Sequence, residues 1–203
     1  KTFFNLIKKR KFPITTINYL PIKKFNKILL LGSGGITIGQ AGEFDYTGNQ
    51  AIKALKEENI EIILVNPNIA TIQTSKDMAD KTYFVPVIKS TIKKIIEKER
   101  PDGIMLQFGG QTALNCGIDL YKSGILEEYG VTILGTQIET IISTEDREIF
   151  NNILKNIDEP FIETYVANDL EEAKINVLKI GFPVLVRSNY SLGGLGSGFA
   201  NNM

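Results

Sequence analysis

The stretch KILLLGSGG at residues 27–35 decides the fold class, because it places a short apolar run directly before a glycine-rich turn. Such a run is typical of a strand that is buried on both faces of a parallel sheet. Residues 47–58 follow with apolar side chains at helical spacing, and residues 61–65 form a second apolar run. The order strand, helix, strand predicts the first unit of a doubly wound α/β fold.

The same alternation continues to about residue 135. Further strands are expected at residues 82–85, 103–108 and 131–135, and helices at residues 91–99 and after Gly110. In the first of these helices Ile92, Ile95 and Ile96 share one face, so we expect that face to lie against the sheet. The sequence therefore predicts a complete doubly wound domain with a parallel sheet over residues 27–142.

A different rhythm begins with STED at residues 143–146. This spacing matches a capping box and predicts a helix that buries Phe150, Ile153 and Leu154. A strand at residues 161–166, a helix at residues 170–179 behind Asp169 and a strand at residues 183–187 are expected next. We expect residues 143–203 to be the truncated start of a second domain.

The charge of the chain is unevenly distributed. Residues 1–27 carry eight Lys or Arg and no acid, so the rest of the chain holds 15 basic and 23 acidic side chains. A mildly acidic body argues against a nucleic-acid-binding surface. We interpret residues 1–26 as a basic linker from a preceding domain, because Pro13 and Pro21 interrupt any long amphipathic helix and the chain does not begin with Met. A transit peptide and a nuclear signal are the alternatives.

Residue types that are missing limit the possible chemistry. The chain has one cysteine, Cys116, and no histidine. This composition excludes an internal disulfide and a cysteine-based zinc site, and it removes the usual proton shuttle at neutral pH. We expect Cys116 to be a small buried residue, since no histidine is available to activate it as a nucleophile. The apolar runs are too short to cross a bilayer, so no membrane is expected.

Two glycine-rich segments are candidate phosphate loops. Gly32 to Gly35 fits a dinucleotide motif poorly, because Thr37 stands where the third glycine belongs and no acid follows the second strand. We expect a tight structural turn there, with a dinucleotide site as the alternative. The run SLGGLGSG at residues 191–198 is the stronger candidate, since it follows a strand that ends in Arg187. A surface hairpin explains its spacing equally well.

Two charged residues stand near predicted helix starts. Arg147 lies in the first turn of its helix, where a cation is mildly unfavourable unless it faces an anion. An ordinary solvated arginine is the simpler local interpretation. Glu43 and Asp45 precede the first predicted helix, where acids stabilise the positive end of the helix. Capping explains Asp45 well and Glu43 less well.

Four longer segments of the sequence are informative together: IGQAGEFDY at residues 38–46, VNPNIAT at residues 65–71, GGQTALNC at residues 109–116 and TEDR at residues 144–147. They resemble the first synthetase half of the large subunit of carbamoyl phosphate synthetase. The loop GGLGSGFA at residues 193–200 is similar to that of eukaryotic, glutamine-dependent members. The likeness runs from about Lys27 to Met203. It implies a Rossmann-like preATP-grasp domain at residues 27–142 and the start of an ATP-grasp domain at residues 143–203.

The resemblance implies an ATP-dependent carbon–nitrogen ligase. The whole enzyme would phosphorylate bicarbonate with ATP to carboxyphosphate, which reacts with ammonia to give carbamate, and a second synthetase half downstream would make carbamoyl phosphate. Arg147, Arg187, Gly193 and Gly194 would contact ATP, and Glu43 would line the passage for carbamate. The catalytic residues and the ligands of Mg²⁺ or Mn²⁺ would lie beyond Met203, so this chain alone is expected to be inactive.

The same resemblance gives expectations about partners and compartment. Ammonia would come from glutamine through a glutaminase domain or subunit, which is expected to be fused upstream. The product would feed pyrimidine synthesis in the cytoplasm, with arginine or urea synthesis and a mitochondrial location as alternatives. One departure from the family is Ser188-Asn189-Tyr190 after Arg187, where many members have Pro-Ser. Another ATP-grasp ligase, such as a biotin carboxylase, and a non-catalytic nucleotide-binding module remain competing interpretations.

Overall fold

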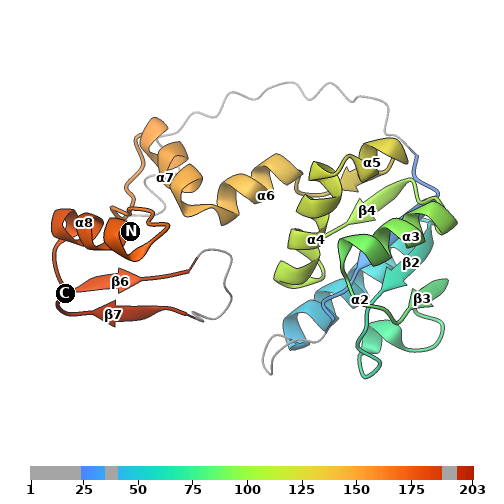
Figure 1. Ribbon diagram of the computed structural model, residues 1–203. Coiled ribbons are helices and arrows are strands. Elements are labelled where there is room, and N and C mark those ends of the chain that lie inside the picture. Colours follow the sequence, from blue (N-terminus) through green and yellow to red (C-terminus); the bar gives the residue numbers. More distant parts are fainter. Residues whose placement is uncertain (1–23, 35–40, 189–195) are drawn as a thin grey trace, which may run out of the picture.

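The computed structural model describes residues 24–34, 41–188 and 196–203. Its first unit is a five-stranded parallel sheet with helices on both faces (Figure 1). The unit contains β1 (Lys27–Leu31), α2 (Ala41–Glu57), β2 (Glu61–Val65), the 3₁₀ helix η1 (Ile72–Thr74), β3 (Lys81–Tyr83), α3 (Lys89–Glu99), β4 (Gly103–Met105), α4 (Gly110–Lys122), α5 (Ile125–Glu128), β5 (Thr132–Leu134) and α6 (Ile138–Glu145). The strand order β3-β2-β1-β4-β5 confirms the predicted doubly wound α/β fold.

The two faces of the sheet are covered by different helices. Successive side chains of a strand point to opposite faces, so β1 contributes to both sides. Leu29 and Leu31 pack in one apolar cluster with buried residues of α3, α4, α5 and α6. Ile28 and Leu30 pack in the other cluster, which α2 closes with Ile52 and Leu55. This arrangement explains why β1 is an unbroken apolar run.

A charged group lies between β3 and the end of α3. Glu99 is the last residue of α3 and only 6% exposed. Its carboxylate accepts hydrogen bonds from Lys81 Nζ at 2.7 Å and from the Tyr83 hydroxyl at 2.5 Å. A negative charge at the carboxyl end of a helix is unfavourable, so these donors offset both the burial and the helix dipole.

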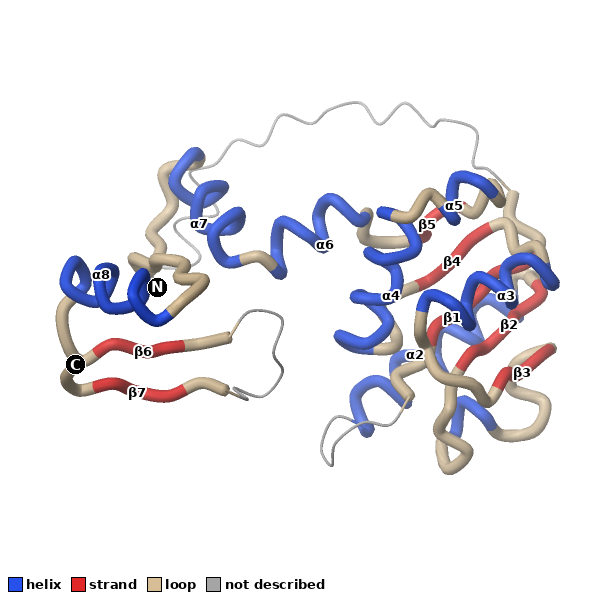
Figure 2. Tube along the Cα trace, viewed as in Figure 1, coloured by secondary structure: helices blue, strands red, loops and turns tan. Residues whose placement is uncertain are grey.

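The second unit is small and open. It contains α7 (Arg147–Asn156), α8 (Leu170–Ile180), β6 (Val184–Val186) and β7 (Gly198–Ala200). The strands β6 and β7 pair in an antiparallel hairpin. Figure 2 shows this hairpin apart from the five-stranded sheet, with α6 leading from the sheet unit to α7. Leu185 on β6 and Phe199 on β7 are largely exposed, so the hairpin does not close an apolar core.

The start of α2 differs from the prediction. The helix begins at Ala41, six residues before the predicted start at Thr47. Asp45 therefore lies inside the helix and does not cap it, and its Oδ1 atom is buried without a hydrogen-bond partner. The segment AGEFDY contains no proline, and its acids lie in the first two turns, where they stabilise the positive helix end. Local sequence thus permits the longer helix.

The junction after the sheet unit also differs from the prediction. Residues 143–145 end α6, a helix that the sequence analysis did not predict, and Asp146 takes the capping role that was assigned to Ser143. Phe150 and Ile153 are 39% exposed and are not buried as predicted. Residues 161–166 form no regular strand. The carbonyls of Ile162 and Val166 accept hydrogen bonds from asparagine side chains of α7 and α8 instead.

Candidate functional site

The candidate site begins at the junction of α6 and α7. Asp146 is the one residue between these helices. Its backbone N–H donates to the Ile142 carbonyl at 3.0 Å and ends α6. Its Oδ1 accepts the backbone N–H groups of Glu148 at 3.0 Å and Ile149 at 3.1 Å, which caps α7. Arg147 is therefore the first residue of a capped helix, in the turn where the sequence analysis predicted it.

Arg147 reaches from this junction to the hairpin. Its Nη1 donates a hydrogen bond to the Ser188 carbonyl at 3.2 Å, across 41 positions of sequence. Ser188 directly follows Arg187, which leaves the carboxyl end of β6 with an exposed side chain. The contact thus brings the two arginines, which the sequence analysis assigned to the same ligand, to one end of the hairpin.

The opposite strand completes the neck of the hairpin, which we define as residues 187–188 and 196–197. Gly196 has a left-handed backbone with φ of 71°, and a Cβ there would lie 3.3 Å from Ser188 Oγ. The hydroxyl of Ser197 is buried without a hydrogen-bond partner. Guanidinium groups at this end of the hairpin would suit the oxygens of a polyphosphate. Gly193 and Gly194 lie outside the described residues.

Glu43 lies in the first turn of α2, and its side chain falls outside the described part of the structure. From a distant part of the chain, the fully buried amide of Gln73 anchors this helix. Gln73 Nε2 donates to the Phe44 carbonyl at 2.7 Å, and Gln73 Oε1 accepts from Asn66 Nδ2 at 3.3 Å. A Cβ on Gly48 would lie 2.4 Å from Gln73 Nε2, so the amide fills the available space.

The chain reverses its direction of winding between β1 and β4, where open α/β sheets commonly bind ligands. In this structure the residues that follow β1 and β4 pack against each other at that position. A Cβ on Gly109 would lie 2.6 Å from the Gly32 carbonyl oxygen, and the ring of Phe44 lies against Gly110. Gly34 adopts a left-handed backbone with φ of 68°. Such close packing favours the structural turn that the sequence analysis expected over a dinucleotide site.

Cys116 lies on α4 inside the core. The side chain is 4% exposed, and burial raises the pKa of its thiol to about 12. The thiol therefore stays protonated at neutral pH and cannot act as a thiolate nucleophile.

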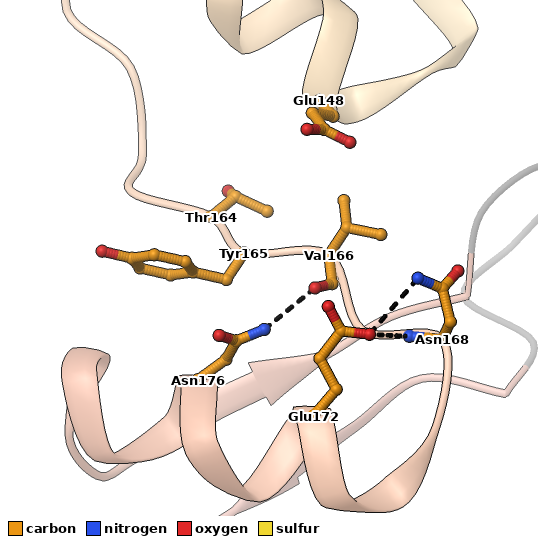
Figure 3. A pocket seen from close by; sticks show the side chains of 7 residues that line it. All are labelled: Glu148, Thr164, Tyr165, Val166, Asn168, Glu172 and Asn176. Atoms are coloured by element: carbon orange, nitrogen blue, oxygen red, sulfur yellow. Dashed lines mark hydrogen bonds between the residues drawn. The ribbon is translucent and has the colours of Figure 1, made fainter.

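A polar pocket of about 400 Å³ lies between α7 and α8. It is lined by Glu148, Thr164, Tyr165, Val166, Asn168, Glu172 and Asn176 (Figure 3). Glu172 Oε2 accepts hydrogen bonds from the backbone and side chain of Asn168, and Asn176 Nδ2 donates to the Val166 carbonyl. The lining holds two carboxylates and no Lys or Arg, so the pocket would repel phosphates. The neck of the hairpin is the better candidate for an anion.

A metal site is not found in the part of the chain that the structure describes, where no group of three His, Cys, Asp or Glu side chains is placed to hold an ion. Among the same residues, no helix has the length and apolar character required to span a membrane.

Three residues of this site are not predicted from the sequence. The sequence places Asp146 inside a capping box, although aspartate is itself one of the residue types preferred at a helix N-cap. Ser188 was noted only as a departure from the family, and Gly196 only as one glycine of a run. The contact of Ser188 with Arg147 spans 41 positions, so local sequence carries no signal for it.

A parallel sheet domain that leads into a smaller unit of two helices and an antiparallel hairpin has a counterpart among solved structures. The biotin carboxylase domain of Hydrogenobacter thermophilus 2-oxoglutarate carboxylase, solved with MgADP, ADP and bicarbonate, has the same fold. The TM-score is 0.65 at 23% identity, and the match covers 88% of this chain and 38% of that chain. This likeness extends over both units.

The particular family follows from the sequence matches. Residues 24–143 match the carbamoyl phosphate synthase preATP-grasp domain, and residues 146–203 match the ATP binding domain of the carbamoyl-phosphate synthase L chain. The chain belongs to the carbamoyl phosphate synthase large-chain family. This result confirms the resemblance seen in the sequence.

Two curated relatives illustrate the range of the family. Multifunctional protein pyr1-3 of Dictyostelium discoideum is 64% identical over 180 residues, which cover 89% of this chain and 8% of that protein. The mitochondrial carbamoyl-phosphate synthase [ammonia] of Rattus norvegicus is 49% identical over 210 residues, which cover 99% of this chain and 14% of that protein. The chain therefore spans a small part of the length of these relatives.

Proposed function

We propose that this chain supplies the preATP-grasp domain and the first elements of the ATP-grasp domain in the first synthetase half of a carbamoyl phosphate synthetase. The proposed division is a linker at residues 1–26, the sheet domain at residues 27–142 and the start of the ATP-grasp domain at residues 143–203. The whole protein would phosphorylate bicarbonate with ATP, combine the product with ammonia to form carbamate, and convert carbamate to carbamoyl phosphate. The family match over both units carries this proposal.

ATP would bind at the neck of the hairpin and supply the phosphoryl group. Arg147 and Arg187 would neutralise charge on its phosphate oxygens, and Gly193 and Gly194 would offer backbone N–H groups to them. The hydrogen bond from Arg147 to the Ser188 carbonyl supports this assignment, because it holds both arginines at the same end of the hairpin. Divalent Mg²⁺ or Mn²⁺ would be held by carboxylates and amides that follow Met203, and Glu43 would line the carbamate passage.

The source of ammonia and the compartment are further proposals. The whole protein would be a glutamine-dependent, cytoplasmic enzyme of pyrimidine synthesis, with a fused glutaminase domain upstream and a second synthetase half downstream. The identity of 64% to the multifunctional relative, against 49% to the mitochondrial one, supports this proposal. The relative named for ammonia and the mitochondrion keeps the alternative open. Assays of the whole enzyme with glutamine or with ammonium salts as the nitrogen donor test these alternatives. Activity with glutamine supports the glutamine-dependent enzyme, and activity with ammonium salts alone supports the ammonia-dependent one.

The test of the proposed chemistry is ADP release by the whole first synthetase half with and without bicarbonate. We expect bicarbonate to stimulate ATP hydrolysis and Arg187→Ala to reduce the stimulated rate by about 100-fold, because one donor to the developing charge is lost. Lys174→Ala is a matched control, since it removes an exposed cation of the same unit that pairs with Glu171 on its own helix. If ATP binds while bicarbonate leaves the rate unchanged, the protein is a nucleotide-binding module without this activity.

A further inference from the structure

The structure points to a role for a residue beside the proposed ATP contacts: we propose that Asp146 is a positioning residue for nucleotide binding. It fixes the start of α7, from which Arg147 reaches the neck of the hairpin. This inference rests on the proposed function for the identity of the nucleotide. It goes beyond that function, because Asp146 itself would not touch the ligand.

The first step is the anchoring of α6 on the sheet unit. Ile138 and Ile141 are buried in the core cluster on the α3–α4 face of the sheet. The Tyr121 hydroxyl on α4 donates to Glu139 Oε1 at 2.6 Å. The helix is thus held by packing and by a hydrogen bond, and its end at Glu145 has a fixed place relative to the sheet.

The second step is the transfer of this position to α7. Asp146 ends α6 with its backbone N–H and begins α7 with its side chain. No other residue separates the two helices. Loss of the carboxylate would leave the backbone N–H groups of Glu148 and Ile149 without their acceptor, and the first turn of a helix frays when its cap is lost. Arg147 lies in that turn.

The third step is the reach of Arg147 to the hairpin. Its hydrogen bond to the Ser188 carbonyl is exposed to solvent, and the donor atom Nη1 lies at the end of a long, flexible side chain. Such a contact is maintained only when the backbone at its origin is well placed, because a free arginine side chain has large rotamer entropy. A guanidinium group carries five N–H donors, so this bond is compatible with contact to a phosphate oxygen.

The test uses the whole first synthetase half with three variants at the cap. Asp146→Ala is expected to raise the KM for ATP and the dissociation constant for MgADP about fivefold to tenfold, the size typical of a lost cap, while kcat changes less than about twofold. Asp146→Asn and Asp146→Ser retain a cap acceptor, and both are expected to restore the KM to within about twofold of the original.

Asp169→Ala is the matched control. Asp169 caps α8 in the same unit by accepting the Glu172 N–H at 2.8 Å, and it begins no helix that carries a predicted ATP contact. This variant should lose thermal stability to a similar degree while keeping its KM for ATP. An equal rise of KM in Asp169→Ala, or an unchanged KM in Asp146→Ala, would overturn the positioning role.

The two readouts separate this inference from the proposed function. Should MgADP bind the unaltered protein while bicarbonate fails to stimulate hydrolysis, the proposed reaction is lost, and the dissociation constants of the variants still decide the role of Asp146. Should bicarbonate stimulate hydrolysis while Asp146→Ala binds MgADP normally, only the positioning role is lost. A protein that binds no MgADP at all refutes both.

Discussion

The two units of this chain contrast in how they use apolar side chains. In the sheet unit, Leu29, Leu30 and Leu31 are completely buried between helices on both faces. In the hairpin unit, Leu185 is 47% and Phe199 is 76% exposed. The sequence is similarly apolar in both places, so hydrophobic residues alone do not make a core. A core also needs both faces of the sheet to be covered by other elements. Among the described residues, only the sheet unit has both faces covered.

The largest expected effect compares the same substitution in both units. Leu30→Ala should reduce the free energy of unfolding by about 3–5 kcal/mol, because it removes buried methyl groups and leaves a cavity. Leu185→Ala should cost less than about 1 kcal/mol, since half of that side chain already contacts solvent. Urea denaturation followed by circular dichroism measures both. Equal losses would contradict the contrast between the units.

A glycine pair gives the next effect. Gly109→Ala should cost about 1–3 kcal/mol, because its Cβ would meet backbone oxygens of Leu31 and Gly32 that cannot move aside freely. Gly198→Ala, on β7, meets nothing within 4 Å and should change stability by less than about 0.5 kcal/mol. Thermal unfolding of the two variants compares a packed loop with an open strand. A neutral Gly109→Ala would mean that the β1 and β4 loops are looser than described.

The smallest effect concerns pH. Hydrogen bonds from Lys81 and then from Tyr83 hold the pKa of Glu99 below its ordinary value of 4.5. A carboxylate with a lowered pKa stabilises the folded state above its unfolded pKa, and this contribution is lost as the pH falls through the folded pKa. Glu99→Gln should therefore destabilise the protein at pH 7 and flatten the loss of stability below pH 4.5.

The matched variant for this pH effect is Glu171→Gln. Its carboxylate pairs with Lys174 on the exposed surface of α8, where solvent screens the interaction. We expect its unfolding free energy to follow that of the unaltered protein at every pH. If Glu99→Gln behaves in the same way, the buried group at the end of α3 adds nothing to acid stability.

The fold of the sheet unit could be predicted where burial imposes a simple pattern. The central strands are unbroken apolar runs because both of their faces are covered, and Ile92, Ile95 and Ile96 keep helical spacing because one face of α3 meets the sheet. In the second unit the helix behind Asp169 and the strand at residues 184–186 agree with the prediction. The expected strand at residues 161–166 is wrong, because a strand needs a neighbour that local sequence does not supply.

The candidate site was predictable only in part. Arg147 and Arg187 were found through the family resemblance, and their local sequence favoured an ordinary surface role for Arg147. Their common location depends on a contact across 41 residues, which no periodicity encodes. The cap at Asp146 was not predicted, because α6 ends and α7 begins at this one residue and the local sequence does not separate the two helices.

The single-residue junction at Asp146 also limits how the length of the chain can vary. Surface connections normally absorb inserted residues without consequence. Here one added residue would turn the start of α7 by about 100° and advance it by about 1.5 Å, if the helix were simply extended. Arg147 would then point away from the hairpin. The spacing between the sheet unit and its first arginine is therefore expected to tolerate substitutions far better than insertions or deletions.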